Sequence, residues 1–211
     1  AIGHSALTTQ NAGADAYNVA LGYYSGFALT TGVNNTLIGS LAGDAITTGA
    51  SNTAVGKSAL SANTTAGRNT AVGFNSLTAN TTGDNNTAVG ENSGLATTTG
   101  HNNTFIGQDA GEANTTGDYN VALGSDALDS NTTADNNTAI GAAALAANTT
   151  GANNTASGIG SLQSNTTASN NSAFGRLALQ ANTTGTANVA MGETPLYTNT
   201  TGNFNVGLGN A

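Results

Sequence analysis

The chain repeats one pattern of polar and apolar positions every seventeen residues, with the consensus N-T-A-V-G-x-x-A-L-x-A-N-T-T-G-x-N. A fixed short period of this kind is typical of a solenoid, in which each repeat forms one rung and buries an apolar face against the next rung. We number the positions of the repeat 1 to 17 from its first Asn. This Asn occurs at Asn18, Asn35, Asn52, Asn69, Asn86, Asn103, Asn120, Asn137, Asn154, Asn171, Asn188 and Asn205.

Positions 2 to 4 of each repeat predict a β-strand. Position 2 is usually Thr or Val, and position 4 is apolar in every repeat except the one that carries Ser157. Because residues two apart lie on the same face of a strand, the side chains at position 4 should form a continuous apolar row down one side of the stack. Ser157 is expected to be the single polar interruption of that row.

Glycine follows each predicted strand at position 5, and Gly3 is its equivalent at the start of the chain. Glycine is required where the backbone adopts a positive φ or closely approaches another backbone, so we expect substitutions here to be destabilising. The row consists of Gly22, Gly39, Gly56, Gly73, Gly90, Gly107, Gly124, Gly141, Gly158, Gly175, Gly192 and Gly209.

The second half of the repeat combines a variable apolar position with a Thr pair. Position 9 is Leu or Gly, and we expect nearby apolar residues such as Phe27, Ile46 or Leu95 to fill the space in the Gly repeats. The Thr residues at positions 13 and 14 are adjacent, so one should face inward and the other outward.

A second Asn row is predicted at position 12. Identical amides stacked at the strand spacing of ~4.8 Å can hydrogen-bond from rung to rung, so both Asn rows are interpreted as structural ladders. The alternative for position 12 is N-glycosylation, because Asn-Thr-Thr is an acceptor sequence. This row contains Asn63, Asn80, Asn114, Asn131, Asn148, Asn165, Asn182 and Asn199.

These patterns predict one all-β domain over residues 1–211, a parallel β-solenoid of about thirteen rungs of 17 residues. Rungs at ~4.8 Å would make a rod of roughly 60 Å. Residues 18–211 form regular rungs. The first rung, 1–17, is irregular, because the segment from Thr8 to Tyr17 holds a two-residue insertion relative to the period.

Composition and charge argue against several functions. The net charge is −8 and the three basic residues are scattered, which disfavours nucleic acid as a partner. The chain has no cysteine, and no apolar run approaches the ~20 residues of a membrane span, so we expect no membrane insertion. The few Lys and Arg residues offer trypsin-like proteases few cleavage sites, which favours an extracellular or cell-surface location.

Candidate catalytic chemistry is sparse. His4 and His101 lie about six rungs apart and cannot meet within one chain. Asp84, Asp118 and Asp135 share position 16, where calcium binding is an alternative to solvated turn acids, but one carboxylate per rung is a weak ligand set. We therefore predict a non-enzymatic protein without catalytic, cofactor or metal sites.

Each rung offers few large apolar side chains against the ordering entropy of seventeen residues, at ~1–2 kcal/mol per residue. We therefore expect copies of the chain to bury a second face against one another, most simply as a homotrimer. We also expect head-to-tail contacts between the two ends, made by Ala1, Ile2 and Gly3 of one copy and Leu208, Gly209 and Asn210 of the next.

The motifs Asn-Thr-Ala-Val-Gly at 52–56, 69–73 and 86–90, Asn-Val-Ala-Leu-Gly at 18–22 and 120–124, and Asn-Thr-Ala-Ile-Gly at 137–141 resemble the head repeats of trimeric autotransporter adhesins. With Asn-Thr-Thr-Gly between copies, they also resemble shafts of bacteriophage tail fibres. The resemblance covers nearly the whole chain, although the period is longer than in the adhesin heads. It implies a left-handed β-roll, usually trimeric, displayed outside a cell or on a virion.

The sequence thus predicts a structural protein of an extracellular filament or fibre whose main partner is itself. One alternative is an adhesin head or tail-fibre segment that binds a surface receptor. The other is an ice-binding solenoid, which would need Thr-x-Thr on one outward face.

Overall fold

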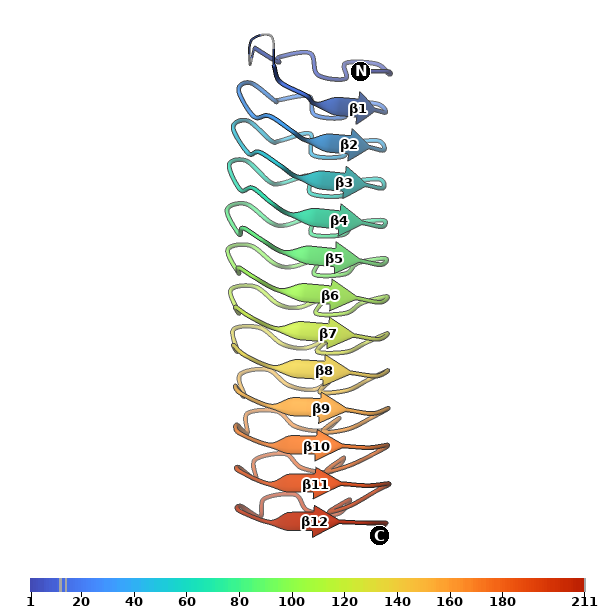
Figure 1. Ribbon diagram of the computed structural model, residues 1–211, viewed down its shortest axis with the longest axis vertical. Coiled ribbons are helices and arrows are strands. Elements are labelled where there is room, and N and C mark those ends of the chain that lie inside the picture. Colours follow the sequence, from blue (N-terminus) through green and yellow to red (C-terminus); the bar gives the residue numbers. More distant parts are fainter. Residues whose placement is uncertain (12, 14, 211) are drawn as a thin grey trace.

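The computed structural model describes residues 1–11, 13 and 15–210, and over these residues the chain winds into one straight stack of rungs (Figure 1). Twelve three-residue strands form one parallel sheet in sequence order. They are β1 (Val19–Leu21), β2 (Thr36–Ile38), β3 (Thr53–Val55), β4 (Thr70–Val72), β5 (Thr87–Val89), β6 (Thr104–Ile106), β7 (Val121–Leu123), β8 (Thr138–Ile140), β9 (Thr155–Ser157), β10 (Ser172–Phe174), β11 (Val189–Met191) and β12 (Val206–Leu208).

Each strand pairs with the equivalent residues of the next repeat, as in the register of Thr53 with Thr70, seventeen residues later. A single bridge between Ile2 and Leu21 joins the first rung to β1. In Figure 1 the strands lie on the near side and run from left to right while the chain descends, so the coil is left-handed. The predicted parallel β-solenoid is therefore confirmed. The irregular first rung carries no strand, and its predicted insertion includes residues 12 and 14, which lie outside the described residues.

The strands are short because residues with positive φ bracket them. In the rung of β6, Asn102 precedes the strand with a φ of 59° and Gly107 follows it with a φ of 134°. Further left-handed residues, Asp109 and Gly111, bend the return path of the chain. Hydrogen bonds between rungs continue outside the strands, as from the Leu77 N–H to the Ser93 carbonyl at 3.0 Å. Strands and turns alike are therefore held by the neighbouring rungs.

The core is thin and runs the length of the stack. Position 3, the middle residue of each strand, is buried from β1 to β11 and is Ala in most rungs. Leu at position 9 reaches across from the opposite wall, as Leu60 and Leu77 do, with Ala or Ser at position 8 beside it. One leucine and two small residues therefore make up most of the apolar interior of a regular rung.

Two rungs fill the same space in another way. Leu37 and Phe105 replace Ala at position 3, and the position 9 residues on either side of each are glycines. A Cβ added at Gly94 or Gly111 would lie 2.8 or 2.5 Å from the Phe105 ring. The expectation that neighbouring apolar residues compensate is right for Ile46, which is buried, but wrong for Phe27 and Leu95, which are not.

Candidate interaction surface

The outer face of the twelve-stranded sheet carries an apolar row that no other part of the described chain covers. Positions 2 and 4 of each strand point outward while position 3 points inward, and this gives a burial pattern with only the central residue buried. Leu21 is 44% exposed, Ile106 40%, Ile140 41% and Met191 51%. The apolar row predicted at position 4 therefore lies on the surface, and the small residues at position 3 form the core.

The outward row has a uniform part and an irregular part. From β2 to β8 it contains only branched aliphatic residues, which are Ile38, Val55, Val72, Val89, Ile106, Leu123 and Ile140. From β9 to β12 it changes to Ser157, Phe174, Met191 and Leu208. Ser157 and Phe174 are direct partners in adjacent strands, so a small polar side chain lies beside a large aromatic one.

Position 2 forms a second outward row, mostly of threonines, beside the apolar row. Each strand therefore presents Thr-x-aliphatic on its outer face, as in Thr70 and Val72. The Thr-x-Thr pattern that the ice-binding alternative needs is not present on this face.

The position 1 asparagines form a ladder inside the rod, as predicted. The Oδ1 of Asn103 accepts a hydrogen bond from the Asn120 backbone N–H at 2.9 Å, and its Nδ2 donates to the Gly117 carbonyl at 2.8 Å. The same side-chain oxygen contact to the next rung recurs from Asn18 to Asn205. From Asn18 to Asn188 each amide thus binds the rung that follows. Each of them also links two walls of its own rung, except Asn137, whose Nδ2 is buried without a partner.

The position 12 asparagines form a second ladder. Asn131 donates from Nδ2 to the Oδ1 of Asn114 at 2.9 Å, and the contact repeats down the stack to Asn199. The row is broken at Thr97, and the hydroxyl of Thr97 and the Oδ1 of Asn80 are both buried without a partner. Because these amides are almost all fully buried, the folded rod cannot present them for glycosylation, and the ladder interpretation holds.

The position 5 glycines lie where predicted, and from Gly22 to Gly192 the next rung leaves no room for a side chain. Their φ values are strongly positive, and a Cβ at Gly90 would collide with the Gly107 carbonyl of the next rung. The Thr pairs also divide as expected. Thr98 at position 13 donates its hydroxyl to the Thr115 carbonyl at 3.0 Å, whereas Thr99 at position 14 is exposed.

The acids at position 16 have a role that the sequence did not reveal. A carboxylate oxygen of Asp135 accepts from the Asp118 backbone N–H at 2.7 Å, and Asp118 and Asp84 bind the rungs above them in the same way. His101 belongs to this row and accepts from the Asp84 N–H at 2.9 Å. These side chains therefore cap backbone N–H groups. Within the described residues no group of three or more His, Cys, Asp or Glu residues has a geometry that could hold a metal ion.

A separate group of carboxylates lies on the return path of two adjacent rungs. Burial raises the pKa of Glu112 and of Asp129, and the nearby negative charges of Asp109 and Asp126 raise both further. Burial also raises the pKa of Asp44. These three groups accordingly favour protonation in the folded rod.

The residues predicted to join molecules end to end lie at opposite ends of the rod (Figure 1). At one end Ile2 is bridged to Leu21. At the other, Leu208 belongs to β12 and is 73% exposed, and the Asn210 side chain accepts from the Glu193 N–H at 3.2 Å. One chain does not bring the two groups together, so their contact requires a second copy.

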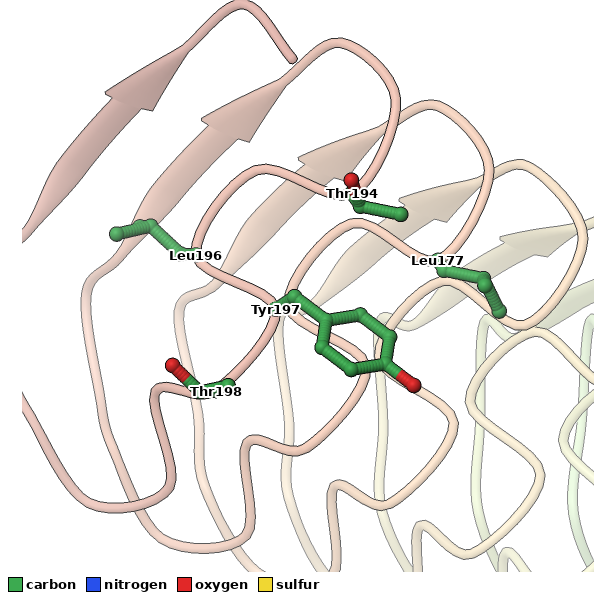
Figure 2. A pocket seen from close by; sticks show the side chains of 5 residues that line it. All are labelled: Leu177, Thr194, Leu196, Tyr197 and Thr198. Carbon is green, nitrogen blue, oxygen red and sulfur yellow. The ribbon is translucent and has the colours of Figure 1, made fainter. Parts of the chain in front are cut away.

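A hollow of about 480 Å³ lies near the C-terminal end, on the return side of the last rungs (Figure 2). In Figure 2 the Tyr197 ring lies between Thr198 and Leu177 in this view, with Thr194 above it. Leu196 and Thr198 complete the lining. This lining offers apolar surface and hydroxyl groups but no carboxylate, imidazole or amine for acid–base catalysis.

Aromatic side chains gather beside the sheet in the first two rungs, a cluster that the repeat pattern did not predict. The ring centroids of Tyr23 and Tyr24 are 4.5 Å apart, and His4 stacks on Tyr23 at 5.5 Å. Phe27 lies 4.7 Å from Tyr24. Tyr23 remains 53% exposed, so the cluster presents aromatic surface to the solvent.

No protein family, characterised protein or solved structure was found that matches this chain. None of the described segments forms a helix with the length and apolarity that crossing a membrane requires.

Proposed function

We propose that this chain is a non-enzymatic structural segment of an extracellular fibre, in which copies associate side by side through the outer face of the sheet. The observation that carries the proposal is the exposed apolar row, which extends from Leu21 to Leu208 over all strands with Ser157 as its polar interruption. Exposed apolar patches of this extent are typical of interaction surfaces.

A second copy of the chain is the partner that fits this row best. Its side chains recur once per rung, at a spacing of ~4.8 Å, and only a partner with the same spacing can match them along the full length. The face is about 10 Å wide and about 50 Å long, so a full-length contact buries about 1,000 Å² between two copies, near the lower limit for a stable interface.

A closed homotrimer is the assembly we propose, because a ring of three copies turns every outward row toward one axis and leaves none exposed. The resemblance to trimeric adhesin heads supports the same assembly and a location outside the cell. The rod also suits a mechanical role, since hydrogen bonds between rungs run along its axis. Contacts between rod ends would extend the fibre further.

The oligomeric mass in solution tests the proposal. Analytical ultracentrifugation of the native chain should give three times the 20.5 kDa chain mass. The double variant Ile106→Lys/Ile140→Lys should be monomeric with an intact fold, because two charges then enter the contact. Thr99→Lys/Thr133→Lys makes the same charge change at exposed positions away from the row and should remain trimeric. A native chain that is monomeric over the micromolar range would refute the proposal.

The aromatic cluster favours a second candidate function, attachment to a surface receptor as in an adhesin head or a tail fibre. Exposed aromatic side chains are frequent anchors of binding interfaces. Tyr23→Ala should then reduce binding of the purified protein to target cells or to a glycan array, while Tyr119→Ala, an exposed tyrosine in the rung between β6 and β7, should not. Equal binding by both variants would remove this candidate.

A further inference from the structure

We propose that the Ser157–Phe174 step on the outer face fixes the axial register between copies, so that they lie parallel and at the same level. This inference rests on the proposed side-by-side association and specifies its geometry. The step is the largest change along a row that is otherwise uniformly aliphatic from β2 to β8. After a slip of a whole number of rungs, a uniform row contacts an identical row equally well in every pair of rungs that remains, so it defines the register only through the overlap lost at the ends.

Ser157 supplies the polar contribution to the choice of register. Its side chain points outward from β9 between Ile140 and Phe174 in the same row. When the copies are level, Ser157 hydroxyl groups meet one another and can exchange hydrogen bonds inside the contact. After a slip of one rung the hydroxyl faces an aliphatic or phenyl group and loses its partner, and an unpaired buried polar group is costly. A single buried asparagine selects the register of coiled coils for the same reason.

Phe174 supplies the steric contribution to the choice of register. It is 39% exposed, and its ring is wider than the spacing between rungs, so it needs room at a neighbouring level. Ser157 leaves that room on one side, and Met191 is flexible enough to adjust on the other. Level copies also bring the phenyl rings together, where they can adopt favourable offset or edge-to-face contacts.

An antiparallel pair is the main competitor, because a two-fold axis between β9 and β10 would place each Phe174 over the Ser157 of the other copy. That arrangement leaves the Ser157 hydroxyl unpaired beneath a ring. It also overlaps only β7 to β12 and leaves the row on β1 to β6 uncovered. The parallel level arrangement covers all twelve strands, and we therefore favour it.

Spin-label distances between copies test the inference, and the chain suits this because it contains no cysteine of its own. Thr48→Cys and Thr184→Cys place labels at exposed position 14 near the two ends, eight rungs apart. In a level parallel assembly, each variant alone gives the same short distance between copies. In the antiparallel pair, Thr184 labels are close but Thr48 labels are far apart.

Mixing the two variants with orthogonal labels makes the measurement sensitive to slip, since one rung changes the axial separation by ~4.8 Å. The native chain should give one distance peak. The population of this register should exceed that of each register shifted by one rung at least about tenfold, a ratio that corresponds to a free-energy difference of ~1.4 kcal/mol. Ser157→Val/Phe174→Val makes the row uniform and should spread the signal over several peaks. Ser157→Thr keeps the hydroxyl and should keep the single peak.

The outcomes separate the two proposals. Three results would overturn the register inference but leave the proposed association intact. They are several distance peaks in the native chain, a single peak in the uniform variant, and a large distance between Thr48 labels. A monomeric mass without any distance between copies would overturn the association itself. One native peak that is lost only in the uniform variant supports both.

Discussion

At position 5 of every repeat before the last, the backbone of the next rung leaves no space for a Cβ atom. A Cβ at Gly107 would lie 2.5 Å from the Gly124 carbonyl oxygen, and the φ of 134° is unfavourable for any other residue. We predict that Gly107→Ala lowers the free energy of unfolding by about 3 kcal/mol or more, measured by denaturant titration. Gly209→Ala is the control, because its φ is 104° but its Cβ would meet no atom within 4 Å. It should cost about 1 to 2 kcal/mol, and equal losses in the two variants would exclude the steric explanation.

The buried amide ladder gives the second prediction for a single residue. Asn103→Ala leaves the Asn120 N–H without its acceptor in the core, while the Gly117 carbonyl keeps the hydrogen bond that the Asn114 Nδ2 donates at 3.1 Å. Because an unsatisfied buried group costs about 1–3 kcal/mol, we expect the free energy of unfolding to fall by about 1 to 3 kcal/mol in thermal or chemical unfolding. Thr99→Ala, at an exposed position near it, should change stability by less than about 0.5 kcal/mol. An Asn103→Ala rod as stable as the native rod would mean that the ladder is dispensable.

The sequence was sufficient to predict both Asn rows and the glycine row, because each recurs at a fixed position and has a single local physical cause. It was insufficient for the position 16 side chains. The shared position of Asp84 and Asp118 was visible in the sequence, but their action on backbone N–H groups, and the place of His101 in the same row, appear only when the rungs are stacked.

At the scale of the rung, large and small side chains compensate for one another at positions 3 and 9, which face each other across the core. Phe105 fills the space that Leu at position 9 fills elsewhere, and Gly94 and Gly111 leave it room. We predict that Phe105→Ala costs about 3 to 5 kcal/mol, because it opens a cavity in a dry core. Adding Gly94→Leu and Gly111→Leu restores the arrangement of the regular rungs and should recover most of the lost melting temperature. A triple variant less stable than Phe105→Ala would contradict this account.

The strands themselves could be predicted from the period of two, including the shared face of positions 2 and 4. The alternation does not say which face is inward. Position 4 carries the larger apolar residues and resembles a core row, but the interior has room for only a methyl group opposite Leu60 or Leu77. The narrow cross-section, which depends on packing across the rung, decides the orientation.

For the whole molecule, acid should stabilise the fold. The pKa values of Asp44, Glu112 and Asp129 are raised in the folded state, so the folded chain binds protons more readily than the unfolded chain. Their contribution is therefore fully present below the unfolded pKa values and is lost as pH rises through the folded ones. The melting temperature should rise as the pH is lowered from 7 toward 4. Asp129→Asn should make this dependence shallower, whereas a steeper or inverted profile would contradict the assignment.

A whole-rung deletion tests the stack as a unit. Removing residues 137–153 joins Asn136 to Asn154 and keeps every row in register, since the two flanking rungs have the same residue types at positions 9 and 12. Because rungs interact mainly with their neighbours, we expect a cooperative fold whose melting temperature changes by a few degrees. Removing residues 137–152 instead shifts every row by one position and should abolish cooperative unfolding followed by circular dichroism. Similar behaviour of the two deletions would contradict the stacked register.

The interchangeable rungs have a consequence for how such a rod can evolve. Near-identical coding units invite unequal recombination, which adds or removes whole units, and a seventeen-residue unit brings its own amides, glycine and strand to both new junctions. The length of the rod can therefore change in steps of one rung without any compensating substitution. Natural selection can adjust the length of the rod by whole repeats, while residues that depart from the consensus, such as Phe105 and Phe174, distinguish particular repeats from the others.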